Sequence, residues 1–480
     1  MNLPLKKTKI VCTIGPASQS CEILEEMIRN GMNVARLNFA HGDFESHRQM
    51  IADIRAAEEA VGERVALLAD LPGPKIRIGR LKDDPIELVR DQPFTLVPED
   101  MEGDTYRASI SFAGLPLVVR PGNTIFLNDG LVQLRVEAIK GQAVHCTVVV
   151  GGQLRSQKGV NFPGIDLGVS AFTDLDRECL KFALAQGVDA VGESFVQGPE
   201  DVHALREAAG EAGQDLFVIA KIERLRALDN IDAILDAADG IMVARGDLGV
   251  EVPVERIAVV QKGLIEKANV RGKPVITATQ MLESMVFNPR PTRAEVTDVS
   301  NAILDGTDCV MLSEESASGA YPAEAVAVMS RVARVTEAHL SARPLRQALD
   351  TAEEEGDLNI EDLISLSVNA TARKLTPKVI ITPTETGATA RRIARFRIPV
   401  WIAGVSANES TCQRLQFSYG VYPVFQPAYP EDLEGYAREA LARLGITEGL
   451  IILTQGPSPG HRGETNRMEI IDLRKQRGEA

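Results

Sequence analysis

The chain has 480 residues, 44% of them hydrophobic and 25% charged, which corresponds to about three globular domains of ordinary composition. Its 67 Asp and Glu residues exceed its 52 Lys and Arg residues, and the formal net charge is −15. This balance argues against nucleic acid or an anionic membrane as the main partner. An anionic substrate must therefore be held by a local cluster of cations or by a metal ion.

The cysteines and the apolar runs indicate the compartment. Six cysteines lie far apart without a C-x-x-C pair, so they offer neither a disulfide framework nor a zinc-site spacing. No apolar run reaches the ~18 residues of a membrane span, and no signal-peptide core follows the lysine-rich start. We expect a soluble cytoplasmic protein with reduced thiols and no membrane partner.

Short apolar runs rich in Val and Ile alternate with helical patterns, the rhythm of parallel βα units. Eight such runs would close a (β/α)8 TIM barrel, whose active site forms at the C-terminal ends of its strands. The runs are residues 9–14, 34–38, 65–70, 190–195, 216–222, 240–244, 274–278 and 309–312.

Two further domains are expected around this barrel. Residues 72–166 interrupt it with alternating strands and turns, including a hairpin signal at Asn128-Asp129-Gly130 between runs 124–127 and 131–136, and predict an inserted all-β lid. Removing the lid leaves residues 1–71 and 167–345, roughly the 250 residues typical of this barrel.

The acidic stretch 344–357 suits a linker or an exposed helix end. Residues 346–480, which include most of this stretch, predict a C-terminal open-sheet α/β domain with ligand loops beyond its strand ends. Its strands are expected at 379–382, 400–403, 421–425 and 450–454, with a helix at 388–396 after the first.

Charged side chains follow two neighbouring barrel strands. Strand alternation places Lys221 and Glu223 on the same inward face, and Asp247 follows the next strand. Two carboxylates can bind Mg²⁺ and leave positions for substrate oxygens, with the lysine aimed at the same anion. The alternative is a set of inter-strand ion pairs, but inward charges at several strand ends are costly unless they meet a metal or ligand.

Other barrel strands end in polar residues. Arg36 could make forked contacts to a phosphoryl group, and Pro72-Gly73 reads as the hinge into the insertion. His41 is by default a surface or packing histidine, and Thr279 by default a strand-end cap. Nucleotide motifs of the P-loop and G-x-G-x-x-G types are absent, as are histidine spacings for zinc.

Five separated strings, in order along essentially all 480 residues, resemble the pyruvate kinase family, in particular its bacterial, potassium-independent members. They are TKIVCTIGPAS at 8–18, GMNVARLNF at 31–39, IMVARGDLGVE at 241–251, ATQMLESM at 278–285 and PTRAE at 291–295. The resemblance implies transfer of the phosphoryl group of phosphoenolpyruvate to ADP, then protonation of the enolate to pyruvate, as the last step of glycolysis. It also implies Mg²⁺, with Mn²⁺ as the alternative ion, and a homotetramer.

The resemblance further implies a role for each matched residue. Glu223 and Asp247 match the metal ligands, and Lys221 and Arg36 the cations at the transferring phosphoryl group. The amides of Gly246 and Asp247 match those that receive the substrate carboxylate at a helix start. The remaining matches are Thr279 near the enolate carbon, Ser313 and Glu315 in the proton relay, and Asn38, His41, Arg77 and Lys158 at the nucleotide or its phosphates.

The potassium site departs from the family pattern. Five positions that form the potassium site of potassium-requiring members here read Asn38, Ala40, Asp70, Leu71 and Lys75. Two side-chain oxygens are missing, and an ammonium stands where the family often has a carboxylate. A second cation would be repelled there. We expect Lys75, with Asn38 and Asp70, to replace K⁺, so that turnover needs Mg²⁺ but not K⁺.

A loop rich in hydroxyls in the third domain resembles the family's effector loop. We expect a phosphorylated allosteric activator, a sugar monophosphate or AMP rather than a bisphosphate, because Glu385 adds a repelling charge. A plain capped helix start is the alternative. The effector residues would be Thr382, Thr384, Thr386, Gly387 and Thr389, supported by Arg462 and Thr465.

Glu193 is an acid where the family pattern leads us to expect a small or apolar residue, and the sequence gives no physical account of it. Two other functions compete with the kinase. One is a lyase or aldolase that forms the same enolate on Mg²⁺, which leaves Lys221 and a nucleotide-closing lid unexplained. The other is a non-catalytic metabolite sensor with a decayed barrel.

Overall fold

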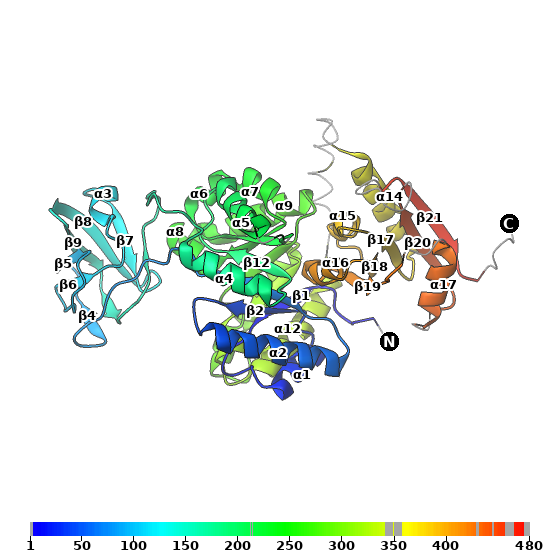
Figure 1. The fold of residues 1–480 in the computed structure, drawn as a ribbon, viewed down its shortest axis with the longest axis horizontal. Helices are drawn as coiled ribbons and strands as arrows, with labels where there is room; N and C mark the ends of the chain where they lie inside the picture. The colour runs from blue at the N-terminus through cyan, green and yellow to red at the C-terminus, as the bar shows by residue number, and fades with distance from the viewer. Residues whose placement is uncertain are drawn as a thin grey trace.

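A computed structural model describes residues 3–211, 213, 215–340, 349, 358–428, 432–443, 446–456 and 465–474. Three bodies follow one another along the long axis: a six-stranded sheet at one end, a closed barrel in the middle and a five-stranded sheet at the other end (Figure 1). The expected boundary between residues 345 and 346, the linker 344–357 apart from Leu349, and Arg462 lie outside the described residues. Among the described residues, no helix is long and apolar enough to cross a membrane.

The barrel contains the eight predicted strands, each parallel to its neighbours, in the closed order β1-β16-β15-β14-β13-β12-β3-β2. The prediction of a TIM barrel is confirmed, with every strand starting and ending within two residues of the expected run. The strands are β1 Lys9–Thr13, β2 Val34–Asn38, β3 Ala66–Asp70, β12 Ala190–Glu193, β13 Val218–Ile222, β14 Gly240–Ala244, β15 Val275–Ala278 and β16 Cys309–Leu312.

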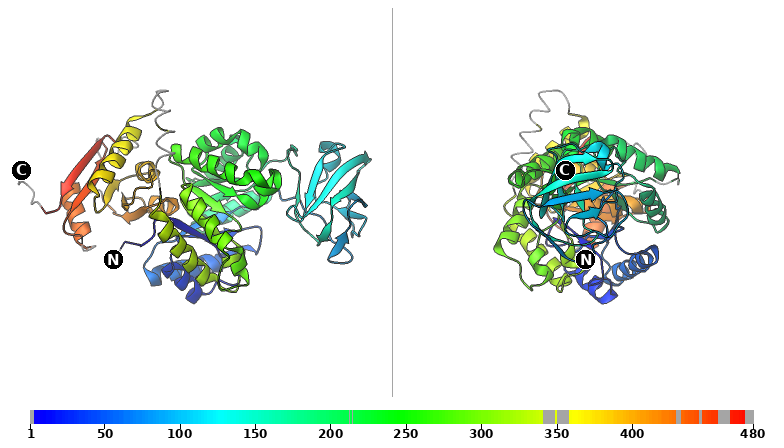
Figure 2. Two further views of the ribbon diagram at one scale, coloured as in Figure 1. Left: turned by 180° about the vertical axis from the view of Figure 1, so that it is seen from behind. Right: turned by 90° about the vertical axis from the view of Figure 1, so that its left-hand side faces the viewer.

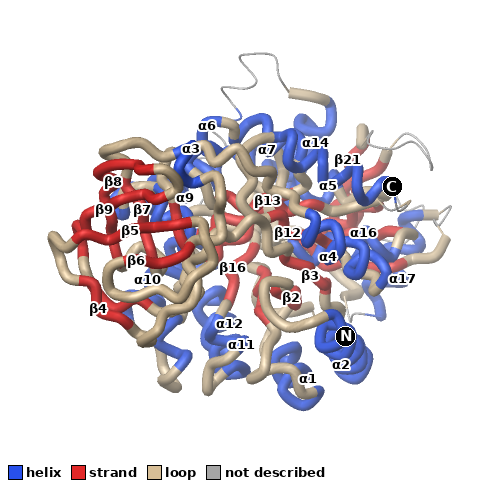
Figure 3. Tube along the Cα trace, turned by 60° about the vertical axis from the view of Figure 1, so that its left-hand side comes forward, coloured by secondary structure: helices blue, strands red, loops and turns tan. Residues whose placement is uncertain are grey.

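Helices surround these strands, as the tube trace shows (Figure 3). Successive strand residues pack on opposite sides: Val11 and Ala190 lie in the barrel interior, while Ile10 and Val191 pack against the helix layer. The helices are α1 Cys21–Arg29, α2 Phe44–Val61, α4 Asp174–Ala185, α5 Pro199–Glu211, α6 Leu225–Asp229, α7 Ile231–Ala237, α8 Arg245–Glu251, α9 Ile257–Val270, α10 Arg293–Leu304, α11 Glu314–Ala317 and α12 Pro322–Glu337.

The inserted sheet leaves the barrel after β3 and returns before α4, so it stands beyond the C-terminal ends of the barrel strands (Figure 2). The predicted hairpin is present: β7 pairs antiparallel with β8, and Asn128, Asp129 and Gly130 all have positive φ. The insertion comprises β4 Ile86–Leu88, β5 Pro93–Val97, β6 Arg107–Ser109, α3 Leu115–Val118, β7 Thr124–Leu127, β8 Val132–Lys140, β9 Ala143–Val150, β10 Gly152–Leu154 and β11 Val160–Asn161.

The C-terminal sheet has the order β19-β18-β17-β20-β21. The four predicted strands are present and parallel, and a fifth, β21, pairs antiparallel with β20 at the edge. The elements are α14 Ile360–Leu375, β17 Ile380–Pro383, α15 Ala388–Ala394, β18 Ile402–Ser406, α16 Glu409–Arg414, β19 Val421–Phe425, α17 Leu433–Arg443, β20 Leu450–Gln455 and β21 Arg467–Asp472.

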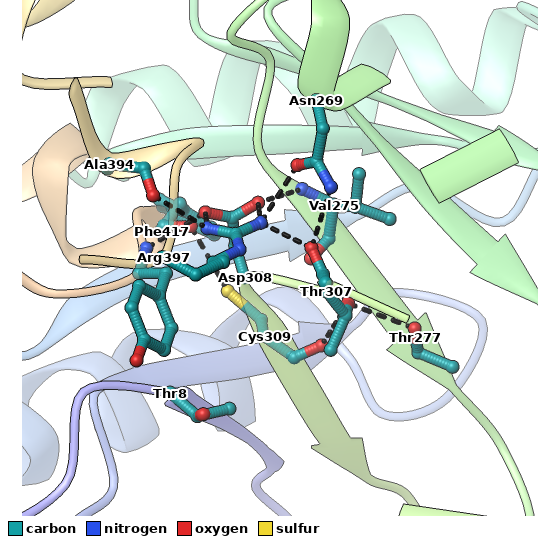
Figure 4. Close-up of polar contacts among 12 residues, drawn as sticks. Thr8, Asn269, Val275, Thr277, Thr307, Asp308, Cys309, Ala394, Arg397 and Phe417 are labelled. Carbon is teal, nitrogen blue, oxygen red and sulfur yellow. Dashed lines mark hydrogen bonds and ion pairs between the residues drawn. The ribbon is translucent and has the colours of Figure 1, made fainter. Parts of the chain in front are cut away.

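A buried ion pair joins the segment between α15 and β18 to the N-terminal end of the barrel strand β16 (Figure 4). Arg397 Nη1 lies 2.8 Å from Asp308 Oδ1, and its Nη2 donates to Asn269 Oδ1 at 2.8 Å. Asp308 also accepts the backbone N–H groups of Val275 and Tyr419. Since only 4% and 6% of the two charged side chains are exposed, each charge depends on the other.

This pair leads to a stability prediction. Asp308→Ala leaves the Arg397 guanidinium buried without its carboxylate, and we expect a loss of about 3–5 kcal/mol in the free energy of unfolding. Urea unfolding monitored by circular dichroism measures it. Glu211→Ala is the control, because its pair with Arg177 is largely exposed and is expected to contribute less than about 1 kcal/mol. Equal effects of the two substitutions would refute the structural role of the buried pair.

Candidate active site

Lys221 lies at the centre of the charges in the open mouth of the barrel. Its Nζ atom is 3.0 Å from Asp70 Oδ1, 3.0 Å from Glu223 Oε1 and donates to Ser194 Oγ at 2.6 Å. These partners come from the ends of β3, β12 and β13, so the parallel strands bring together residues up to 153 positions apart in the sequence. Burial opposes the charge on Lys221, but Asp70 and Glu223 outweigh it and raise the pKa of the lysine above its ordinary value.

Asp70 joins this lysine to Arg36. Its Oδ2 lies 2.5 Å from Arg36 Nε, and Arg36 Nη1 donates to Thr13 Oγ1 at 2.8 Å. Burial disfavours the Asp70 carboxylate, but Lys221 and Arg36 overcome that cost and hold the pKa of Asp70 below its ordinary value. Both cations therefore keep fixed positions at neutral pH without a bound substrate.

Glu223 and Asp247 supply the carboxylates expected to bind the metal. Glu223 Oε2 accepts the backbone N–H of Phe195 at 2.7 Å, whereas Asp247 is partly exposed in the first turn of α8. Burial raises the pKa of Glu223, and Asp247 raises it further through its negative charge while Lys221 opposes the shift. The two carboxylates are thus close enough to interact electrostatically.

The donor set fits Mg²⁺. The ion prefers oxygen ligands, and it is usually bound by one or two protein carboxylates with waters and substrate oxygens completing the shell. Among the described residues, no three His, Cys, Asp or Glu side chains are arranged to hold a metal. A two-carboxylate site that shares its ion with substrate agrees with both observations.

Strained backbone holds Thr279 at the end of β15. Thr279 and Gln280 have backbone φ values of +68° and +54°, a conformation that residues other than glycine rarely adopt. Thr279 Oγ1 accepts the N–H of Gly246 at 2.8 Å, and Arg245 Nη2 donates to the Thr279 carbonyl at 2.6 Å. The threonine hydroxyl therefore touches one of the amides expected to receive the substrate carboxylate.

The two residues expected in the proton relay, Ser313 and Glu315, differ in their hydrogen bonding. Both Glu315 oxygens accept backbone N–H groups, from Leu282 at 3.0 Å and from Ser313 at 2.7 Å. The Ser313 hydroxyl is buried and has no hydrogen-bond partner within the described part of the chain. Glu315 therefore fixes two backbone segments, and Ser313 keeps a hydroxyl available.

The residues expected at the nucleotide gather between β2 and the inserted sheet. Burial lowers the pKa of His41, and the positive charges of Arg77, Lys75 and Arg36 lower it further. Arg77 Nη1 donates to the Gln157 carbonyl at 2.9 Å. This arrangement gathers positive charge beside a neutral imidazole.

Three other expected residues lie near this group. Lys158 is partly exposed and follows Gln157, while Asn38 Oδ1 accepts the N–H of Ala40 at 3.2 Å. Lys75 is exposed, and within the described residues the carboxylate of Asp70 pairs with Arg36 and Lys221 rather than with Lys75.

The expected effector loop is braced by its own hydroxyls. Thr384 Oγ1 accepts the N–H of Gly387 at 2.9 Å, and Thr389 and Thr465 share a hydrogen bond of 2.6 Å. Thr382 is fully buried and accepts from Thr454, so its hydroxyl supports the loop from below. Thr386 is exposed, and its Oγ1 accepts the N–H of Ala388 at 3.4 Å.

Sequence reasoning missed the side chains that support the charged groups. The sequence patterns assign no role to Ser194, Thr13 or Arg245. The inward parity of Thr13 on β1 and the position of Arg245 directly after β14 were available signals. Their contacts, however, connect strands that are distant in the sequence.

Two family models match the chain: the pyruvate kinase barrel domain over residues 5–326 and the pyruvate kinase alpha/beta domain over residues 362–471. The pyruvate kinase of Thermococcus litoralis is 46% identical over 479 residues, covering 98% of this chain and 100% of that protein. The pyruvate kinase of Clostridium acetobutylicum is 41% identical, over 97% of this chain and 99% of that protein. The pyruvate kinase of Geobacillus stearothermophilus is 44% identical, over 97% of this chain and 80% of that protein. The resemblance read from the sequence is confirmed, and the chain belongs to the pyruvate kinase family of phosphotransferases.

Proposed function

We propose that this enzyme transfers the phosphoryl group of phosphoenolpyruvate to ADP, giving pyruvate and ATP as the last step of glycolysis. The observation that carries the proposal is the convergence of Lys221, Arg36, Glu223 and Asp247 at one barrel mouth. In phosphoryl transfer the protein forms few covalent bonds, and catalysis depends mainly on positioning and electrostatic stabilisation. Fixed cations beside a two-carboxylate metal site supply both.

Lys221 and Arg36 are proposed to contact the transferring phosphoryl group. Asp70 keeps both cations aimed at the mouth, so little reorganisation accompanies the reaction. Glu223 and Asp247 would hold Mg²⁺, or Mn²⁺ as the alternative ion, which when bound neutralises charge on the phosphoryl and enolate oxygens.

The substrate carboxylate is proposed to bind the amides of Gly246 and Asp247 at the start of α8. Thr279 would lie beside the enolate carbon, because its hydroxyl already contacts the Gly246 amide. Ser313 offers the available hydroxyl of the proton relay, and Glu315 positions it through the Ser313 N–H.

The nucleotide is proposed to bind between β2 and the inserted sheet, which acts as a lid hinged near residue 72. Arg77 and Lys158 would contact its phosphates, and Asn38 and His41 would position it. The positive charge gathered around His41 supports a polyphosphate there. We further propose the domain division 1–71 with 167–345, 72–166 and 346–480, a cytoplasmic location, and a homotetramer.

The charge on Lys221 provides the first test of this function. Lys221→Met removes a fixed cation from the phosphoryl group, and we expect kcat to fall by about 10³–10⁵, or about 4–7 kcal/mol. A coupled pyruvate assay with Mg²⁺ measures it. Lys181→Met, an exposed residue of α4, is the control and should remain within about twofold. A loss of less than about tenfold in Lys221→Met would contradict the assigned role.

Potassium independence is the second test. We propose that the Lys75 ammonium replaces K⁺ electrostatically from the edge of the mouth, so exchange of an inert chloride for KCl should change kcat by less than about twofold. Lys75→Glu restores an acidic group and should make turnover rise with KCl. Stimulation of the unmodified enzyme by about tenfold or more at constant ionic strength would show that Lys75 does not serve this purpose.

The activator is the third test. We propose that the loop from Thr384 to Thr389 binds a phosphate monoester, so that AMP or a sugar monophosphate lowers the KM for phosphoenolpyruvate. Thr386→Glu, which adds a second negative charge beside Glu385, should abolish this response. Activation by fructose 1,6-bisphosphate and by no monophosphate would overturn the proposal.

A further inference from the structure

Glu193, unexplained in the sequence, ends β12 on the side away from the reaction. Ala190 packs in the barrel interior and Val191 in the helix layer, so alternation places Glu193 on the helix side and Ser194 on the inside. Glu193 is 1% exposed, and within the described residues neither carboxyl oxygen has a hydrogen-bond partner. A buried carboxyl without partners is costly, and most of that cost belongs to its ionised form.

The two residues after Glu193 hold both charged groups of β13. Ser194 Oγ accepts from Lys221 Nζ and donates to the Leu71 carbonyl, both at 2.6 Å. The N–H of Phe195 donates to Glu223 at 2.7 Å, and Phe195 has a φ of +59°, a strained conformation for an aromatic residue. The Ser194–Phe195 turn therefore sets the positions of Lys221 and Glu223.

Two carboxylates face Glu193 from the helices packed against β12. Asp176, at the start of α4, accepts the N–H of Gly73, the glycine of the hinge into the inserted sheet, at 2.9 Å. Asp201, in the first turn of α5, accepts the N–H groups of Gln197 and Gly198 at 2.8 and 3.2 Å. Each carboxylate accepts hydrogen bonds from nearby amides, and neither forms a hydrogen bond with Glu193.

The hinge also packs directly on the turn. A Cβ atom on Gly73 would lie 2.9 Å from the side chains of both Ser194 and Phe195, so only glycine fits there. The lid hinge, the turn and Glu193 thus belong to one packed region. A negative charge added within this region acts electrostatically on all three.

Burial raises the pKa of Glu193 to about 8, and the charges of Asp201 and Asp176 contribute to this shift. Within the described residues, no cationic side chain donates a hydrogen bond to its carboxyl group. An ionised Glu193 would therefore be a third negative charge beside Asp176, which holds the hinge glycine, and Asp201, which holds residues 197 and 198 just after the turn.

We propose that Glu193 is a positioning residue that acts in its neutral form, filling the space behind the Ser194–Phe195 turn. Loss of its proton repels Asp176 and Asp201, shifts the turn, and misplaces Lys221 and Glu223. The inference deepens the proposed phosphoryl transfer and rests on it. It concerns kcat rather than substrate binding, because the turn touches the groups assigned to the transferring phosphoryl and the metal.

The pH profile of kcat at saturating substrate and Mg²⁺ tests the proposal. In the unmodified enzyme kcat should fall about tenfold from pH 7 to pH 9, because about one tenth of a group with a pKa of about 8 stays protonated at pH 9. Glu193→Gln keeps shape and neutrality, so its kcat should match the unmodified enzyme at pH 7 and change by less than about twofold up to pH 9. Glu200→Gln, exposed at the start of α5, is the matched control and should retain the alkaline loss.

Thermal unfolding without substrate or metal provides a readout independent of turnover. An acid whose pKa is raised by folding holds more protons in the folded state, so it makes stability fall as pH rises from about 4.5 towards 8. The Tm of Glu193→Gln should therefore increase relative to that of the unmodified enzyme between pH 6 and pH 9. The apolar variant Glu193→Ala should show the same relative trend even if its packing defect lowers Tm at every pH.

The outcomes separate this inference from the proposed function. Parallel Tm curves and an unchanged alkaline loss of kcat in Glu193→Gln would overturn the role of Glu193. A folded Glu193→Gln that is inactive at every pH would overturn it too, because it would mean that the negative charge is required. Absence of pyruvate formation by the unmodified enzyme would remove the proposed function, and the Tm comparison would still decide whether Glu193 is neutral.

Discussion

The open end of this barrel depends on one buried carboxylate held between two cations. Asp70 is 1% exposed and contacts Arg36 with one oxygen and Lys221 with the other. Without it, two positive charges would face each other in a confined mouth before any substrate arrives. The carboxylate pairs with both side chains, so the phosphoryl group proposed to bind there would meet cations that are already in place.

The position of Asp70 at the end of β3 also connects this mouth to the inserted sheet. The chain passes from Asp70 through the hinge glycine Gly73 into the inserted sheet, and that glycine packs against the Ser194–Phe195 turn. In the same turn, the Ser194 hydroxyl accepts a hydrogen bond from the Lys221 ammonium, and the Phe195 N–H donates to Glu223. Contacts therefore run from the hinge glycine through the turn to Lys221 and Glu223, and the acid behind the turn lies next to this chain of contacts.

The barrel and its charged mouth could be read from the sequence because periodicity determines them. Apolar runs of strand length predicted all eight barrel strands, and alternation along β13 placed Lys221 and Glu223 on one face. Periodicity says nothing about partners across strands, so the Asp70 ion pairs and the support from Ser194 became visible only in three dimensions. The edge strand β21 was missed because it is antiparallel and largely polar on one side, unlike the buried parallel strands beside it.

Glu193 marks the limit of pattern reading, because a lone acid in an apolar run carries no periodic signal; its meaning comes from Asp176 and Asp201 on two different helices. The most direct test of the whole account is the stoichiometry of the reaction with phosphoenolpyruvate, ADP and Mg²⁺ in potassium-free buffer. The account predicts pyruvate and ATP in equal amounts. Pyruvate released with free phosphate and without ATP, or no pyruvate at all, would contradict it.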